Sequence, residues 1–158
     1  MTQNIVSFSD ATIKQSGKVI LSDVSLDVPQ GSFIFLIGRT GSGKSSLIRT
    51  IYGDLALAGG LGSVGDFDLT RLKSKDIPKL RRTLGVVFQD FKLLPDRNIG
   101  DNLQFVLKAT GWRDKKKIDE KINRVMEMVG ISVSFKKFPF ELSGGEQQRI
   151  AIARSLLN

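Results

Sequence analysis

The chain has 158 residues, a hydrophobic share of 41% and a formal net charge of +8, so it is long enough for one domain with its own core. It contains no cysteine, which excludes a disulfide framework and a thiolate metal site. No apolar stretch approaches the length of a membrane-spanning helix, and the first residues lack the pattern of a signal peptide. We therefore expect a cytosolic protein. Its basic residues are scattered along the chain, so we do not expect nucleic acid as a partner.

Two strands are predicted near the N-terminus. Residues 5–8 are mostly apolar, and residues 19–28 alternate well enough for a second strand. Residues 15–18 have the composition of a turn between them, and a further turn is predicted at residues 29–31. The chain therefore begins with an antiparallel pair.

A buried strand is predicted at residues 33–37, because this run is apolar and rich in aromatic and β-branched side chains. It leads into Gly38-Arg-Thr-Gly-Ser-Gly-Lys-Ser45, which fits G-x-x-x-x-G-K-[ST] at every position. Apolar residues at helical spacing follow. Strand, loop and helix in this order are the context that a P-loop requires.

The residue types of this loop suit a triphosphate. Glycines allow a close backbone approach, so that successive N–H groups can ring a phosphate at a helix N-terminus. We expect Lys44 to lie between the β- and γ-phosphates and the Ser45 hydroxyl to ligate Mg²⁺. The predicted nucleotide-binding residues here are Gly38, Arg39, Thr40, Gly41, Ser42, Gly43, Lys44, Ser45 and Ser46.

Residues 60–65 spell G-x-G-x-x-G but do not predict a dinucleotide site. That fingerprint needs a strand before it and a helix after it, whereas here the P-loop helix comes before and no helical period follows. Loops and a short strand are the better interpretation. A short helix is predicted at residues 76–83, with Pro78 in its first turn.

Residues 84–88 predict another buried strand, which ends at Gln89 and Asp90. An acidic residue at a strand end is typical of a Walker B site. Here Gln89 intervenes, and a residue displaced by one points to the other face of the sheet. We therefore predict that Gln89, and not Asp90, is aimed at the nucleotide.

A helical period begins beyond residue 91. Apolar stripes span residues 99–107 and 118–129, and Gly111 and Gly130 close the two helices. We interpret both stripes as core packing. The sequence leaves open whether the other aromatic residues of this region pack in the core or face a partner: Trp112, Phe135, Phe138 and Phe140.

Leu142-Ser-Gly-Gly-Glu-Gln147 precedes a last helical stretch, which runs to Leu157. Small residues with bare N–H groups open this helix, so it is a second helix start suited to an anion. With a P-loop upstream, this is the most specific signal in the sequence.

Three stretches together resemble the motifs of ABC-type ATPases. Gly38–Ser45 resembles the Walker A motif, Gln89 the Q-loop, and Leu142–Gln147 the signature motif. The resemblance covers the whole chain. It implies an α/β P-loop NTPase fold with N-terminal antiparallel strands, a core sheet and a helical subdomain. Residues 1–158 are then one domain, incomplete at its C-terminus. Its expected parts are a nucleotide-binding core at 1–90, a helical subdomain at 91–141, and the signature motif with its helix at 142–158.

The resemblance also implies a homodimer that binds ATP and Mg²⁺ at two shared sites. Lys44 and Ser45 of one subunit would hold the triphosphate and Mg²⁺, and the signature of the other would cap the γ-phosphate. Gln89 would help to ligate the metal and couple it to the helical subdomain, which contacts an integral membrane partner at the cytoplasmic face of the inner (plasma) membrane. The signature residues assigned to the nucleotide are Ser143, Gly144, Gly145, Glu146 and Gln147.

Within this family, residues 85–97 resemble a subgroup that acts in cell division. ATPases of lipoprotein release or import are the alternative, because they share the same motifs and usually vary after Gln89. A P-loop kinase or GTPase would not explain Leu142–Gln147.

Two departures from the family stand out. Gln15 occupies the place of the aromatic residue that stacks on adenine, with Ile13 as the nearest apolar candidate. The Walker B Asp, the catalytic Glu and the switch His are absent, and the chain has no histidine. We therefore expect a fragment of a longer product with no catalytic residue of its own, and exposed apolar faces at residues 33–37 and 84–88. A catalytically silent nucleotide-binding module is the alternative.

Overall fold

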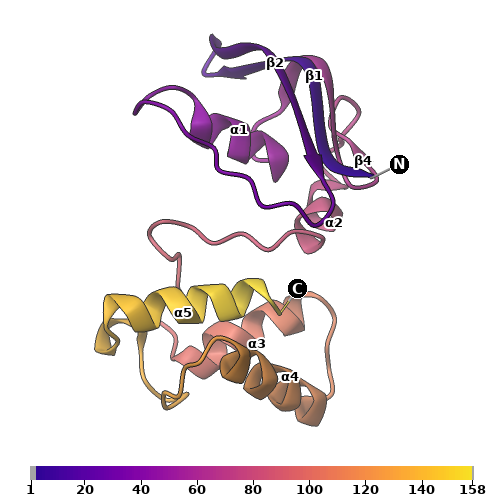
Figure 1. Cartoon of the computed structure of the whole chain (residues 1–158). Coiled ribbons are helices and arrows are strands. Elements are labelled where there is room, and N and C mark those ends of the chain that lie inside the picture. Colours follow the sequence, from indigo (N-terminus) through magenta and orange to yellow (C-terminus); the bar gives the residue numbers. More distant parts are fainter. Residues whose placement is uncertain (1–2, 158) are drawn as a thin grey trace. The chain divides into compact units, whose positions relative to one another are not determined.

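The computed structural model describes residues 3–157, which form two compact units that divide between Arg81 and Arg82 (Figure 1). Within the described residues, every strand belongs to the first unit, and the second unit is helical. None of the helices in residues 3–157 is both long and apolar enough to cross a membrane.

A hairpin starts the first unit. β1 (Asn4–Gln15) and β2 (Lys18–Pro29) pair antiparallel. They are joined by Ser16 and Gly17, which have φ values of 50° and 78°, as the tight turn between twisted strands requires. The predicted antiparallel pair is confirmed.

β3 (Leu57–Val64) and β4 (Phe67–Asp68) complete a sheet in the order β2-β1-β3-β4. The register of β1 and β3 shifts near Gly60. Gly60 has a φ of +75°, and a Cβ there would overlap the backbone of Asp10 in β1, so this irregularity of the sheet requires glycine. The glycine pattern at residues 60–65 therefore lies in and beside a strand, and it forms no dinucleotide loop.

α1 (Lys44–Ile51) packs against β1, and α2 (Ile77–Arg82) buries Leu80 (Figure 1). Both helices lie where the sequence predicts them, because their apolar spacing matches the helical period. The buried apolar residues of this unit are Val6, Phe8, Ala11, Ile13, Leu47, Val64, Leu69 and Leu80.

The second unit packs α3 (Ile99–Ala109) and α4 (Lys115–Met128) against α5 (Gly144–Ser155), which follows a short 3-10 helix at Pro139–Glu141. Both predicted apolar stripes are buried in one core. Its members are Ile99, Leu103, Leu107, Ile118, Ile122, Val125, Met126, Ile131, Leu142, Ile150, Ala153 and Leu157. The sequence does not decide whether four aromatic residues of this region are buried. Two of them, Phe140 and Trp112, are 76% and 38% exposed, so neither is a core residue.

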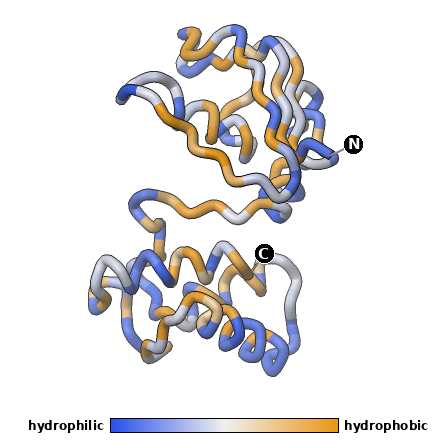
Figure 2. The backbone as a smooth tube through the Cα atoms, viewed as in Figure 1, coloured by the Kyte–Doolittle hydropathy of each residue, from blue (hydrophilic) through white to orange (hydrophobic). Residues whose placement is uncertain are grey.

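Two predicted strands are not formed within residues 3–157, and their prediction was wrong at the level of local structure. Residues 33–37 and 84–88 belong to no sheet, and Figure 2 shows them as apolar stretches of the tube. An apolar run becomes a strand only when a neighbouring strand satisfies its N–H and C=O groups, and the described sheet contains no such neighbour. The expected exposure of apolar side chains is found at residues 33–37, since Phe33 is 82% and Ile37 86% exposed. At residues 84–88 it is found only in part, because Val87 is 44% exposed whereas the other apolar side chains are partly buried.

Candidate functional site

Glycines shape the loop before α1. Gly41 and Gly43 have φ values of +81° and +89°, a backbone region that disfavours other residues. A Cβ at Gly43 would also lie 2.8 Å from the side chain of Leu21. Because α1 begins at Lys44, the free N–H groups of its first turn adjoin this loop. The sequence therefore folds into a helix start that suits an anion.

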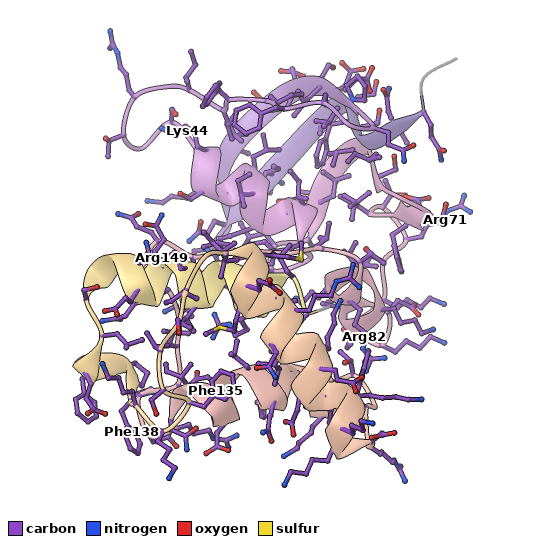
Figure 3. The ribbon with its side chains drawn as sticks, turned by 60° about the horizontal axis from the view of Figure 1, so that its bottom comes forward. Lys44, Arg71, Arg82, Phe135, Phe138 and Arg149 are labelled. Atoms are coloured by element: carbon purple, nitrogen blue, oxygen red, sulfur yellow. The ribbon has the colours of Figure 1, made fainter. Side chains whose placement is uncertain are left out.

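The ammonium group of Lys44 lies inside the loop (Figure 3). Its Nζ donates hydrogen bonds to the carbonyl oxygens of Gly38 and Arg39 at 2.8 and 2.7 Å, and it lies 3.4 Å from Ser42 Oγ. These partners are neutral, so the positive charge remains available to a phosphate at the loop.

A hollow of about 420 Å³ opens beside the loop, within the size range of small-molecule sites. Its lining consists of Ile20, Thr40, Gly41, Ser42, Gly43, Lys44, Ser45 and Ser46. Ser45 is exposed, whereas Ser46 is buried and donates a long hydrogen bond (3.4 Å) from its Oγ to Gln15 Oε1. Residues 40–46 of the predicted P-loop thus line one opening, whereas Gly38 and Arg39 are not part of its lining.

Ile20 also lines this hollow, and no sequence motif predicts it. It lies on β2 and is 38% exposed. Ile13, the apolar candidate for adenine, is fully buried, so it cannot stack on a base and that suggestion was wrong. No local signal marks Ile20, because its place depends on how β2 passes the loop, where its Cγ2 lies 3.2 Å from the position of a Cβ at Gly43.

The donors available for Mg²⁺ are neutral oxygens. The Ser45 hydroxyl is exposed in the first turn of α1, and Gln89 is exposed in the second unit. No group of three or more Asp, Glu, His or Cys side chains in residues 3–157 is arranged to hold a metal. Ser45 and Gln89 each offer a neutral oxygen of the kind that Mg²⁺ accepts beside phosphate oxygens and water.

The segment after Gln89 has an unusual backbone. Phe91 and Lys92 have φ values of +55° and +50°, and the N–H of Lys92 donates to the Asp90 carbonyl at 2.5 Å. Lys92 Nζ lies 2.7 Å from Asp90 Oδ2, and this hydrogen bond lowers the pKa of Asp90 and raises the pKa of Lys92. Arg154 of α5 donates to the carbonyl oxygens of Phe91 and Lys92.

Ser143 caps the start of α5. Its Oγ accepts a hydrogen bond from the N–H of Glu146 at 3.3 Å, while Glu146 Oε2 accepts from the Ser143 N–H at 2.8 Å and the Ser143 hydroxyl at 2.7 Å. The Ser143 hydrogen bonds hold the pKa of Glu146 below its ordinary value. Gly144 and Gly145 are exposed, and a Cβ at Gly144 would meet open space. The helix start that the sequence predicts is therefore formed, and its face is open.

Within the second unit, Gln147 also serves this helix start, since its Nε2 donates to the Leu142 carbonyl at 3.1 Å. Gln89 and Ser143–Gln147 lie in the second unit, and Gly38–Ser46 lie in the first.

Residues 21–158 match the family of ABC transporters. With a glycine-shaped loop before α1 and a capped glycine start of α5, the chain belongs to the ABC transporter family as an ATP-binding domain. Its fold is similar to that of MJ0796, a bacterial ABC transporter cassette, in a dimeric structure (TM-score 0.84, 28% identity, 97% of this chain and 69% of that one). MJ0796 is also known in a dimeric post-hydrolysis state with ADP and Pi (TM-score 0.83).

Among curated relatives, the cell division ATP-binding protein FtsE of Streptococcus pneumoniae is 40% identical over 156 residues, which cover 98% of this chain and 67% of the relative. FtsE of Mycobacterium tuberculosis is 41% identical, with 92% and 63% covered. The methionine import ATP-binding protein MetN of Clostridium tetani is 39% identical, with 91% and 46% covered. The chain thus spans about two thirds of the length of these FtsE relatives.

Proposed function

We propose that this chain binds MgATP at the loop Gly38–Ser46, as the nucleotide-binding part of an FtsE-like ATPase. The observation that carries the proposal is the place of Lys44, whose ammonium lies among carbonyl oxygens at the start of α1 and beside a hollow of about 420 Å³. A phosphate there gains a cation, free N–H groups and a helix N-terminus at once.

Three further residues have proposed roles in holding the ligand. Ser45 offers a hydroxyl to Mg²⁺, and Gln89 is a second ligand of the metal by its resemblance to the Q-loop. Bound Mg²⁺ neutralises phosphate charge. Ile20 offers an apolar side chain to the base, in the absence of an aromatic residue at Gln15.

In the complete protein, we propose a head-to-tail homodimer. Ser143, Gly144 and Gly145 of one subunit would then cap the γ-phosphate held by the other. The dimeric structures of MJ0796, one with ADP and Pi, support this arrangement, and so does the open, capped start of α5. ATP hydrolysis needs a group that positions the attacking water, and we assign no such role to a residue of this chain.

We propose that the ATPase acts on an integral membrane partner, an FtsX-like protein, in cell division. It would do so from the cytoplasmic face of the inner (plasma) membrane. The FtsE relatives at about 40% identity support this choice. Import is the second candidate, because MetN is 39% identical to this chain. Lipoprotein release is a further alternative of the same class, and a silent nucleotide-binding module is the alternative of another class.

Two measurements separate these candidates. The first compares ATP turnover by this chain and by the product of the gene read beyond codon 158; turnover by a longer form that contains a Walker B Asp and a catalytic Glu supports the ATPase. Binding without turnover in any form supports the silent module. The second identifies the membrane protein that copurifies with the ATPase. An FtsX-like protein supports cell division, whereas a substrate-importing permease contradicts it.

A further inference from the structure

Arg154 connects the last turn of α5 with the segment that follows Gln89. Its Nη1 donates to the Lys92 carbonyl oxygen at 2.6 Å, and its Nη2 donates to the Phe91 carbonyl oxygen at 2.7 Å. The side chain is half-buried, and this burial lowers the pKa of the guanidinium. A half-buried charge with two short bonds to one segment is costly to release, because water would have to replace both partners.

The bound segment needs such support. Phe91 and Lys92 both have a left-handed backbone, which costs a side-chain-bearing residue free energy and persists only where surrounding structure holds it. Both side chains of the Asp90–Lys92 ion pair are largely exposed, at 61% and 63%. Exposed ion pairs contribute little to stability. The two hydrogen bonds from Arg154 restrain this turn from a helix that lies 62 and 63 positions further along the chain.

We propose that Arg154 is a positioning residue that fixes the backbone after Gln89 and ties it to α5. The same helix begins at the Ser143 cap, so a single rigid element joins the signature motif to the turn after Gln89. A shift of α5 then moves Phe91 and Lys92, and Gln89 with them. The proposal rests on the proposed function in one respect, the role of Gln89 as a ligand of the metal.

The first test measures hydrogen exchange at the amides of Phe91 and Lys92. We expect Arg154→Ala to speed this exchange about tenfold, the effect of losing charge-assisted bonds to the turn. Arg149→Ala is the matched control, since Arg149 is exposed on the same helix (Figure 3), and it should change nothing. Protected amides at Leu103 and Leu107 in the core of α3 report that the unit is folded. Arg154→Lys keeps the charge and the stem but loses the planar fork, so it should give an intermediate rate.

The second test measures ATP affinity with and without Mg²⁺. We expect both Gln89→Ala and Arg154→Ala to lose the gain in affinity that Mg²⁺ provides, while Mg²⁺-free ATP binds to both variants as it does to the parent. If Arg154 only stabilised the fold, its loss would not selectively reduce the part of the ATP affinity that depends on Mg²⁺.

The outcomes distinguish the two proposals. Unchanged exchange at Phe91 and Lys92 in a folded Arg154→Ala or Arg154→Lys variant overturns the role of Arg154. So does a full Mg²⁺ effect in Arg154→Ala when Gln89→Ala has lost it. If Gln89→Ala keeps the Mg²⁺ effect, the metal role of Gln89 fails instead, and the exchange rates alone decide whether Arg154 holds the turn.

Discussion

Asn102 pairs with both backbone groups of Leu94: its Oδ1 accepts from the Leu94 N–H at 2.7 Å, and its Nδ2 lies 3.0 Å from the Leu94 carbonyl oxygen. Nδ2 also lies 3.1 Å from the Arg97 carbonyl and 3.0 Å from that of Asn98. The side chain is 1% exposed. One buried amide therefore holds residues 94–98, the part of the loop that leads into α3.

Asn102→Ala should lower the free energy of unfolding by about 2–4 kcal/mol, because it leaves several backbone groups of this loop without partners. Asn123→Ala is the control, since Asn123 is exposed on α4, and it should change stability by less than about 0.5 kcal/mol. Urea unfolding of both variants measures the difference. Equal, small effects would contradict the role given to Asn102.

Gly60→Ala should destabilise the first unit by more than about 2 kcal/mol, because two costs add up. The alanine would have to adopt a left-handed backbone, and its Cβ would overlap the backbone of Asp10. Gly65→Ala is the matched control: Gly65 has a φ of +52°, but a Cβ there meets open space. Its cost should be about 1 kcal/mol. Thermal unfolding compares the two, and a Gly60 variant no less stable than the Gly65 variant would refute the close approach.

Glu146→Gln should flatten the dependence of stability on acid pH. The folded-state pKa of Glu146 lies below its ordinary value of 4.5, chiefly through the Ser143 hydrogen bonds. Ionised Glu146 therefore stabilises the fold fully above about pH 4.5, and this contribution is lost as pH falls through the lower folded-state pKa. The parent and the variant should differ in unfolding free energy at neutral pH and converge in acid. A constant difference from neutral pH into acid would show that the carboxylate has no such role.

Ser143→Arg should leave nucleotide binding by a single subunit intact but block ATP-driven dimerisation of the complete protein. Ser143 is exposed in a monomer, so the larger side chain has room there, whereas it would fill the face proposed to cap the γ-phosphate. Ser143→Ala controls for the lost helix cap, which costs about 1 kcal/mol. Size-exclusion chromatography with MgATP measures dimer formation, and normal dimers of the Arg variant would count against the signature role.

The helices of this chain are predictable because each one carries its own signal. The stripes that contain Leu103 and Ile122 repeat at the helical period, and Ser143 stands where a cap is needed. Residues 33–37 carry an equally clear strand signal, yet strand formation depends on a neighbour that no local pattern supplies.

The contacts of Ile20, Asn102 and Arg154 are not predictable from local sequence for the same reason. Arg154 meets Phe91 across 63 positions of the chain, and Ile20 meets the P-loop only because β2 passes beside Gly43. Motif spacing therefore predicts which residues form the loop and the helix start, whereas their supporting residues follow from packing.

The affinity of the chain for ATP, compared with that of Lys44→Ala, tests the central claim most directly. We predict that the chain binds MgATP and that Lys44→Ala weakens binding by about tenfold to a hundredfold, the effect of removing a charge-assisted bond to phosphate. Lys75→Ala, an exposed lysine of the same unit, should bind as the parent does. Equal ATP affinity of the Lys44 variant and the parent, in folded protein, would contradict the assignment of Gly38–Ser45 as the nucleotide site.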